Sequence, residues 1–541
     1  MAPAPPPLRI LVTDNIDADG VAVLRAEPAF AVDELPTMPP AELLARIAGY
    51  DAFVGRSATK ITRELLAAAP KLRVVGRAGV GVDNIAIDFA TELGIAVINA
   101  PAGNTIAVAE LFFGALLALI RDIPRADVSM HDGRWERDAI QGTELRGKTL
   151  GIVGVGRIGT EVAKRARAFE MNLIGYDPYI GDERFAALDM TRAESLDALL
   201  DAANIVTVHT PLTDETRGMI GAAQLTRLRR GAIVANLARG GIVDENALAE
   251  ACRSGAIRGA VVDAFTREPL TGDHPFRELR STLLTPHLGA STEEAQRNVA
   301  VDVCKAVRDA LIEGELSRSI NVASTGADWR QLQSALALAR RCAAVARAWL
   351  ADRDARAIAG VTVRLGAELQ SGASALLASA AVGALSGVVE PARLNLINAR
   401  AVAAARGIEL AVLEPGEAPH PRALEVRVRA DGQEQRVGGV ALAGAAPRLT
   451  RVGPYHIDVA LRGTLVVLTN RDVPGVIGRV GTLLGDAGVN IAEYHQARLV
   501  KGGEALAVIS VDGVISDATR ARLLALPDIL SASVVTFTDG A

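Results

Sequence analysis

Residues 149–159 read TLGIVGVGRIG, an apolar run followed by a turn that contains three glycines. The apolar run predicts a buried strand, and the chain from the turn to about Phe169 has a helical pattern. In such a turn Gly154 permits the tight bend, Gly156 lets the backbone approach a pyrophosphate, and Gly159 allows helix and strand to pack closely. Unpaired N–H groups at the helix N-terminus favour an anion there. The stretch therefore predicts a dinucleotide-binding domain of the α/β class.

An acidic residue follows where such a domain binds the ribose. Asp177 ends the next strand-like segment, eighteen residues after Gly159, and would accept hydrogen bonds from the ribose hydroxyls. At ~4 Å and an effective dielectric of ~20, it would repel a 2′-phosphate by about 4 kcal/mol before solvation and screening. The expected cofactor is therefore NAD rather than NADP. The alternative is a glycine-rich turn in a non-binding domain, with a solvated aspartate.

Composition limits the remaining choices. The 541 residues carry 58 Lys and Arg against 63 Asp and Glu, half are apolar, and 3% are aromatic. This balance predicts roughly three or four folded domains and argues against a nucleic-acid partner. Three scattered cysteines and no HExxH-like motif predict neither a disulfide framework nor a metal site.

No targeting or membrane segment is expected. The N-terminus reads MAPAPPPLRI and lacks the apolar core of a signal peptide. Leu369–Val389 has no charge, but it contains Gln370 and several Ser and Gly, so it predicts buried helix in a soluble domain rather than a span. A cytoplasmic, reducing setting is expected, with no membrane partner.

Strand-like and helical segments alternate along the first 320 residues, which is typical of parallel sheets. The stretch Asn104–Ile120 is almost wholly apolar and predicts a helix buried between domains or subunits. Residues 293–316 predict a long amphipathic helix that ends at Gly314. The last eighty residues predict the order βαββαβ, the ferredoxin-like arrangement.

Three polar residues stand where strands are expected to end: Arg239 in NLARGG, Glu268 in FTREPL and His287 in TPHLGAS. The carboxyl ends of parallel strands face the ligand crevice. Oxidation of a 2-hydroxy acid needs a base, for which His287 is suited, and a carboxylate to orient it, for which Glu268 is suited. Arg239 can bind the substrate carboxylate bidentately. Each residue alone has an ordinary structural explanation, but together they predict a hydroxy-acid dehydrogenase.

Several stretches resemble the family of D-isomer-specific 2-hydroxyacid dehydrogenases. They are VGRSATK (54–60), VGRAGVGVDNI (75–85), PAGNTIAVAE (101–110), GRWERD (133–138), GIVGVGRIG (151–159), NLARGGIVDE (236–245), DAFTREP (263–269) and PHLGAST (286–292). The resemblance implies that Arg239, Glu268 and His287 are the catalytic trio. It also implies a set of cofactor contacts: Val80, Gly154, Gly156, Arg157, Ile158, Gly159, Asp177, Thr210, Leu237, Ala238, Asp263, His287, Gly289 and Ala290.

The resemblance further implies the domain division. A Rossmann-type cofactor domain, 101–285, would be inserted into a flavodoxin-like substrate domain made of 1–100 and 286–320. An α+β intervening domain, 321–460, would follow, and then a ferredoxin-like domain, 461–541. The cleft between the first two domains would close over the substrate and exclude water.

The expected substrate is a small phosphorylated 2-hydroxy acid. A phosphate needs cations beyond the one that binds the carboxylate, and the matching stretches contain further arginines that can supply them. The residues expected to bind it are Arg56, Ser57, Arg77, Asn104 and Arg137. Of these, Arg137 would reach the site from a neighbouring subunit of a homo-oligomer, expected to be a tetramer. For each of the charged residues the alternative is a solvated surface position.

Residues 461–541 resemble the ACT domain, a module that senses small molecules. The match lies in NRDVPGVIG (470–478) and GVNI (488–491). By this resemblance Asp472 and Asn490 would bind an amino-acid effector, expected to be L-serine, between two paired domains. The alternative is that Asp472 caps a helix, Asn490 starts a strand, and the domain only assembles subunits.

Two other functions remain open from the sequence. One is a dehydrogenase of an unphosphorylated acid such as hydroxypyruvate, glyoxylate or D-lactate, which the long C-terminal part disfavours. The other is an NAD-sensing binding protein without catalysis, which the complete trio disfavours. Comparing turnover on phosphorylated and unphosphorylated acids separates these readings.

Overall fold

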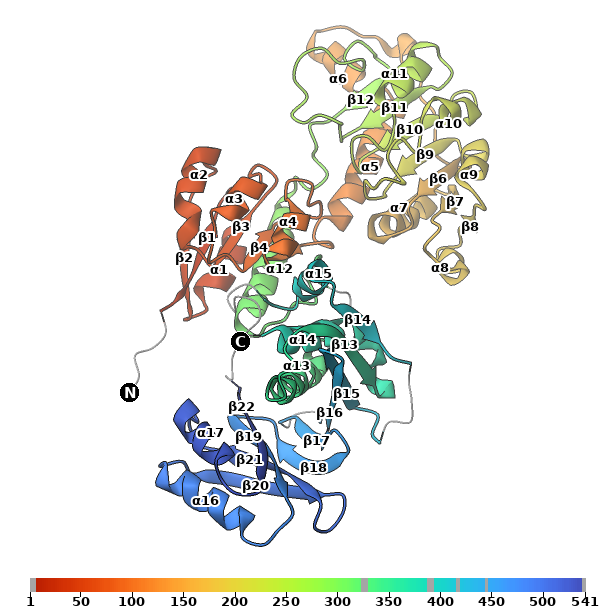
Figure 1. Cartoon of the computed structure of the whole chain (residues 1–541). Coiled ribbons are helices and arrows are strands. Elements are labelled where there is room, and N and C mark those ends of the chain that lie inside the picture. Colours follow the sequence, from red (N-terminus) through yellow and green to blue (C-terminus); the bar gives the residue numbers. More distant parts are fainter. Residues whose placement is uncertain (1–5, 323–328, 387–393, 415–418, 443–445, 538–541) are drawn as a thin grey trace.

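The computed structural model describes residues 6–322, 329–386, 394–414, 419–442 and 446–537. Within these residues the strands form four β-sheets that follow one another along the chain (Figure 1). The first two sheets are wholly parallel, and they carry the residues that the sequence assigns to catalysis and cofactor binding.

The first sheet has five parallel strands in the order β2-β1-β3-β4-β5. This is the flavodoxin-like order 2-1-3-4-5. Its strands are β1 (Leu8–Val12), β2 (Phe30–Glu34), β3 (Ala52–Gly55), β4 (Val74–Arg77) and β5 (Ala96–Asn99), and its helices are α1 (Ala18–Arg25), α2 (Pro40–Arg46), α3 (Arg63–Ala67) and α4 (Ile87–Glu92), with the 3-10 turn η1 (Ile47–Gly49).

Helix α12 (Glu293–Ile312) returns to the first sheet from far along the sequence (Figure 1). Its buried Val303 and Val307 share a hydrophobic core with Ile10 of β1. A Cβ on Gly76 of β4 would lie 2.7 Å from Val307 Cγ2, so the glycine permits the close approach of helix and strand. The helix was predicted within 293–316 with its end at Gly314; it ends two residues earlier, at Ile312, and Gly314 takes φ +64°, which stops the helical path.

The second sheet has seven parallel strands in the order β12-β11-β10-β9-β6-β7-β8. Counted from β6, this is the Rossmann order 3-2-1-4-5-6 with one further strand. The strands are β6 (Thr149–Val153), β7 (Asn172–Tyr176), β8 (Thr191–Arg192), β9 (Ile205–Val208), β10 (Ile233–Asn236), β11 (Gly259–Val262) and β12 (Thr282–Leu284).

Both faces of the second sheet are covered, as parallel sheets require. Helices α5 (Thr105–Ile120) and α7 (Arg157–Ala168) pack on one core, and α9 (Leu196–Ala202), α10 (Ala222–Arg227) and α11 (Glu245–Arg253) pack on the other. The predicted helix over Asn104–Ile120 is confirmed by α5, which begins at Thr105 and buries half of its residues; its burial between domains or subunits stays a prediction. The remaining elements are α6 (Ile123–His131), α8 (Asp182–Ala187) and the 3-10 turn η2 (Arg137–Ala139).

The third sheet is mixed, with the order β14-β13-β15-β16-β17-β18. Its strands are β13 (Ile358–Leu365), β14 (Glu409–Val412), β15 (Ala423–Ala430), β16 (Gln433–Val440), β17 (Arg448–Val452) and β18 (Tyr455–Ala460), and its helices are α13 (Trp329–Ala351), α14 (Ala373–Leu385) and α15 (Ala399–Ala405), with the 3-10 turn η3 (Ala367–Gly372).

The charge-free stretch Leu369–Val389 lies in this third unit. Its described part forms the end of η3 and the buried helix α14, and residues 387–389 lie outside the described residues. Among the described residues, none of the helices combines the length and apolar character needed to cross a bilayer.

The fourth sheet is antiparallel and has the order β20-β21-β19-β22. The predicted βαββαβ order is confirmed by β19 (Thr464–Arg471), α16 (Val476–Asp486), β20 (Ile491–Arg498), β21 (Glu504–Val511), α17 (Asp517–Leu524) and β22 (Ile529–Thr536). One face packs against α16 and α17, and the other contributes Val467 and Val508 to the core of the third unit. The third and fourth sheets are therefore joined through one apolar core.

Candidate active site and dinucleotide site

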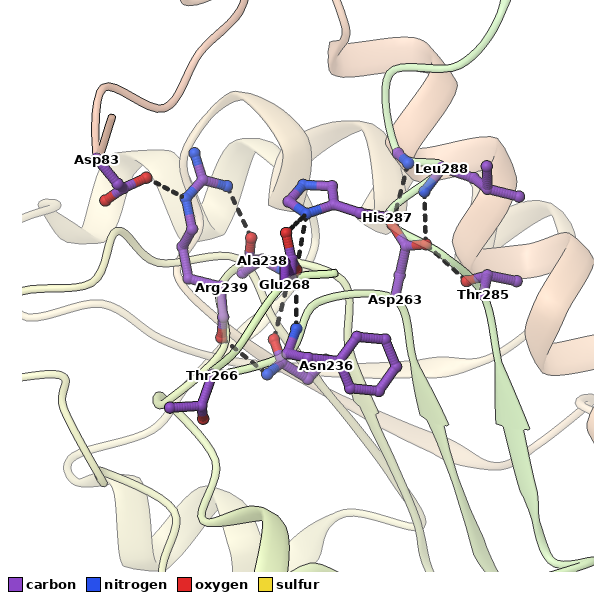
Figure 2. Close-up of polar contacts among 12 residues, drawn as sticks. Asp83, Asn236, Ala238, Arg239, Asp263, Thr266, Glu268, Thr285, His287 and Leu288 are labelled. Atoms are coloured by element: carbon purple, nitrogen blue, oxygen red, sulfur yellow. Dashed lines mark hydrogen bonds and ion pairs between the residues drawn. The ribbon is translucent and has the colours of Figure 1, made fainter. Parts of the chain in front are cut away.

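The three residues of the predicted trio lie on loops that follow neighbouring strands. Arg239 comes after β10, Glu268 after β11 and His287 after β12. These strands are adjacent in the sheet, so their carboxyl ends bring the three loops together. Figure 2 shows the His287 ring turned toward Glu268, with the Arg239 side chain on the same side of the loops.

The ring of His287 is held by a carboxylate. Nδ1 of His287 lies 2.7 Å from Oε2 and 2.9 Å from Oε1 of Glu268. The imidazole is 42% exposed and the carboxylate 36%, and among the described residues Nε2 of His287 has no hydrogen-bond partner. This ring nitrogen is therefore available to a ligand.

Glu268 stays ionised at neutral pH. Partial burial opposes its charge, but hydrogen bonds with His287 and with the backbone N–H of Phe265 outweigh that effect and lower the pKa of the carboxyl group. A carboxylate beside the ring favours the imidazolium that forms when His287 takes a proton.

A buried aspartate fixes the backbone that carries His287. The Asp263 carboxylate, 0% exposed, accepts hydrogen bonds from Thr285 Oγ1 at 2.6 Å, Leu288 N at 2.7 Å and Gly289 N at 3.0 Å. His287 has φ +56°, a left-handed conformation that persists only where the surroundings impose it. The sequence placed Asp263 and Gly289 among cofactor contacts; in this conformation they hold the catalytic loop.

Arg239 bridges the first and second sheets. Its Nη1 donates to Ala238 O at 2.7 Å, and its Nε lies 3.1 Å from Oδ2 of Asp83, in the loop after β4 (Figure 2). Asn236, at the end of β10, shapes the Arg239 loop by donating to Arg239 O and accepting from Ala238 N. Sequence reasoning assigned no role to Asp83 or Asn236, although both lie in the motifs that carry the resemblance.

Positive charge collects beside this trio. Burial, and after it the nearby cations Arg239 and Arg56, lower the pKa of Arg77 to about 10, while Asp83 opposes them. Burial also lowers the pKa of Arg56, which Asp14 partly offsets. Arg56 after β3, Arg77 at the end of β4 and Arg239 after β10 thus lie close enough for Arg77 to be affected by the other two charges. Such a group of cations favours a ligand carrying more than one negative charge.

The other residues expected to bind substrate are placed differently. Ser57 is exposed in the turn after β3. Asn104 is the N-cap residue of α5, and its buried Oδ1 has no hydrogen-bond partner in the described structure. Arg137 lies in the exposed turn η2, and within the described part of the chain it forms no hydrogen bond or ion pair with the cleft residues.

The glycine turn has the geometry that the sequence predicts. Gly154 takes φ +90°, and a Cβ there would lie 2.8 Å from His209 O. A Cβ on Gly159 would lie 2.2 Å from Gly154 O, so helix and turn can touch there only because residue 159 is a glycine. Gly156 is the N-cap residue of α7, and a Cβ there would meet nothing within 4 Å. Open space therefore lies beside the helix N-terminus, which no described side chain caps.

These residues fit NAD. Asp177, at the end of β7, accepts hydrogen bonds from Val155 N and Tyr179 N at 3.0 Å, which places an anionic carboxylate beside the turn. Thr210 Oγ1 is buried without a partner in the described structure. Helix α7 would hold the pyrophosphate at Arg157 and Ile158, its first two residues. Of the other expected contacts, Leu237 is buried, and Val80, Ala238 and Ala290 are half-buried.

The residues expected to bind an effector already have protein partners. Asp472 accepts from Gly502 N at 3.0 Å and pairs with Arg498 at 3.0 Å, and these two interactions lower the pKa of its carboxyl group. Asn490 Nδ2 donates to Asp512 Oδ2 at 2.7 Å. In the described structure no contact joins Asp472 to Asn490.

A Rossmann sheet with this glycine turn, and a histidine–carboxylate pair beside an arginine at the same sheet edge, define an NAD-dependent dehydrogenase. The family described as "D-isomer specific 2-hydroxyacid dehydrogenase, NAD binding domain" matches residues 113–289. The chain is 36% identical to the D-3-phosphoglycerate dehydrogenase of Methanocaldococcus jannaschii, over 98% of this chain and 99% of that protein.

Two further comparisons agree. The D-3-phosphoglycerate dehydrogenase of Bacillus subtilis is 36% identical over 97% of this chain and 99% of its own length. The crystal structure of D-lactate dehydrogenase from Aquifex aeolicus, complexed with NAD and lactic acid, matches 57% of this chain and 96% of its own with a TM-score of 0.52 and 27% identity. The chain belongs to the D-3-phosphoglycerate dehydrogenase family of D-isomer-specific 2-hydroxyacid dehydrogenases, which confirms the predicted resemblance.

Proposed function

We propose that the protein oxidises D-3-phosphoglycerate to 3-phosphohydroxypyruvate with NAD, the first step of L-serine biosynthesis. The observation that carries this proposal is the grouping of Arg56, Arg77 and Arg239 beside the His287–Glu268 pair. A phosphorylated 2-hydroxy acid brings a carboxylate and a phosphate, which are the anions that such a group of cations binds. Relatives that match nearly the full chain are named D-3-phosphoglycerate dehydrogenase.

Each residue of the trio has a separate task. His287 Nε2 takes the proton of the C2 hydroxyl, and Glu268 stabilises the resulting imidazolium and holds the ring. Arg239 binds the carboxylate and so fixes the orientation of C2. Bound NAD supplies the acceptor for the hydride that leaves C2. The balanced products are the 2-keto acid, NADH and one proton, which His287 passes to water.

The domain division follows from these roles. We assign substrate binding to residues 1–100 and 286–320 and NAD binding to 101–285. The Arg239–Asp83 ion pair spans the two units, which supports a cleft that closes between them. Residues 321–460 and 461–541 are assigned as the intervening and ACT domains.

The proposed location is the cytoplasm. The three described cysteines are free and buried, in keeping with a reducing cytoplasm. Fractionation that found the activity outside the cytoplasm would contradict that location.

The substrate is tested by an NADH absorbance assay that compares D-3-phosphoglycerate with glycerate and D-lactate. We expect Arg77→Ala to raise the KM for D-3-phosphoglycerate about 10–100-fold, the value of a lost hydrogen bond to a charged group of ~1.5–3 kcal/mol, and to leave the KM for NAD nearly unchanged. Arg73→Ala, an exposed residue just before β4, is the matched control. Higher kcat/KM on the unphosphorylated acids would contradict the assignment.

The protein is proposed to act as a homo-oligomer. Val128, Met130 and Trp135 on and after α6 are more than half exposed, Trp135 at 76%, and they lie next to Arg137 in the sequence. A second copy seated on this surface would cover them and could bring Arg137 to the neighbouring cleft. We expect sedimentation to give a multiple of 56.4 kDa, and Trp135→Asp to weaken association. A fully active monomer would overturn this proposal.

L-serine is proposed as an effector of the ACT domain, at Asp472 and Asn490. Binding requires the ligand to compete with Arg498, Gly502 and Asp512, the present partners of these side chains. We expect millimolar L-serine, but not D-serine, to lower the rate and raise the Tm. If neither changes, sensing is refuted while the enzyme assignment stands.

A further inference from the structure

The structure contains a second histidine–glutamate pair besides His287 and Glu268. Glu245 is the first residue of α11, and its Oε2 lies 3.0 Å from Nε2 of His274, in the segment between β11 and β12. The two side chains are only 16% and 12% exposed. The pair is outside the trio, and the proposed mechanism does not use it.

The other carboxylate oxygen of Glu245 holds the loop that carries Glu268. Oε1 accepts from Thr266 N at 2.6 Å and from Thr266 Oγ1 at 2.7 Å. Thr266 and Glu268 lie on the same loop, as Figure 2 shows. Glu245 is not needed to cap its own helix, because Asp244 accepts from Ala247 N in that role.

The neighbouring residue Phe265 links this loop to the trio. Its N–H donates to Glu268 Oε1 at 2.9 Å, and its ring meets the His274 ring edge-on, with centroids 5.8 Å apart. A Cβ on Gly240 would lie 2.0 Å from Phe265 C, so the Arg239 loop rests directly on this backbone. The position of residues 265–266 therefore determines where the Glu268 side chain lies and where the loop that carries Arg239 lies.

We propose that Glu245, supported by His274, is a positioning residue that holds the Glu268 carboxylate on Nδ1 of His287. The inference deepens the proposed function, since it takes His287 as the base. The charged groups around the His287 ring are Glu268, in direct contact, and Arg239, which acts on Glu268. If the loop loosens, the imidazolium loses its carboxylate and fewer molecules have a correctly oriented ring.

The test follows the imidazole of His287 by NMR in the full chain, with labelled histidine. The sequence has seven histidines, and the His287 signal is assigned by its loss in His287→Gln. The readout is the Nδ1–H proton of His287, which a hydrogen bond to a carboxylate shifts downfield. We expect Glu245→Ala and Thr266→Val each to move this resonance upfield or to broaden it, because the 2.7 Å contact between Nδ1 and Glu268 Oε2 is no longer held. With this change kcat should fall, while the KM for NAD stays the same.

Two variants make the result specific. Glu268→Gln should move the Nδ1–H resonance of His287 in the same direction, and adding Glu245→Ala to it should produce no further change, because both act through one carboxylate. Glu250→Ala, on the exposed side of the same helix, should change nothing.

A lower kcat or Tm with an unchanged Nδ1–H resonance of His287 would reduce Glu245 to a structural role and overturn the proposal, as would additive changes of that resonance in the double variant. Should Glu245→Ala fail to fold, Thr266→Val gives the answer alone. The NMR measurement requires no turnover, so an error in the proposed substrate is recognised separately, by the assay with D-3-phosphoglycerate.

Discussion

Replacing His287 by alanine is expected to lower kcat about 10²–10⁴-fold, the usual contribution of a positioned general base. His287 Nε2 is the ring nitrogen left available by the two close contacts between Nδ1 and Glu268. Without it the hydroxyl proton has to leave to water while the hydride departs. Steady-state kinetics of NADH formation from D-3-phosphoglycerate, with removal of the product, measures the loss.

The same variant should keep most of its affinity for NAD, because the glycine turn and Asp177 are unchanged and only the expected contact at His287 is lost. His456→Ala, an exposed histidine on β18, is the matched control and should keep full activity. A loss well below a hundredfold for His287→Ala, with NAD binding intact, would show that another group takes the proton.

Replacing Arg239 by alanine is expected to lower kcat/KM for D-3-phosphoglycerate about 10²–10³-fold, equal to ~3–4 kcal/mol of transition-state stabilisation. The guanidinium already spans two elements, with Nη1 on Ala238 O and Nε on Asp83, so its orientation is fixed before a substrate arrives. Kinetics at subsaturating substrate measure the loss directly.

Arg239→Lys separates charge from geometry. The lysine keeps the positive charge but cannot form two parallel hydrogen bonds with a carboxylate. The kcat/KM of Arg239→Lys should therefore be only about tenfold higher than that of Arg239→Ala. Arg253→Ala, in an exposed ion pair on α11, should leave the kinetics unchanged. Full activity of Arg239→Lys would contradict bidentate binding.

The sequence predicted the parts of this protein that depend on local chemistry. The glycine turn at 154–159 is recognisable because each glycine has its own steric reason, and the structure shows the close approaches at Gly154 and Gly159. Residues at strand ends were also found, because the carboxyl ends of parallel strands must converge. The edge strand β2 was missed, since its residues are only half-buried and lack a strong pattern.

Contacts between distant residues could not be predicted. Asp83 lies 156 residues before Arg239, and nothing local to either indicates the ion pair. Asp263 reads as one more cofactor residue in its motif, whereas its three hydrogen bonds to the His287 loop depend on how β11 and β12 pair. In the same way, the motif around Asp472 gives no sign that Arg498 and Gly502 already bind its carboxylate.

The proposed roles of His287 and Arg239 are best tested by a crystal structure of the closed complex with NAD and the product 3-phosphohydroxypyruvate. We expect His287 Nε2 within about 2.6–3.2 Å of the C2 oxygen, Glu268 still on Nδ1, and the Arg239 guanidinium paired with the carboxylate. A closed complex in which the imidazole points away from C2, with no guanidinium on the carboxylate, would contradict these roles.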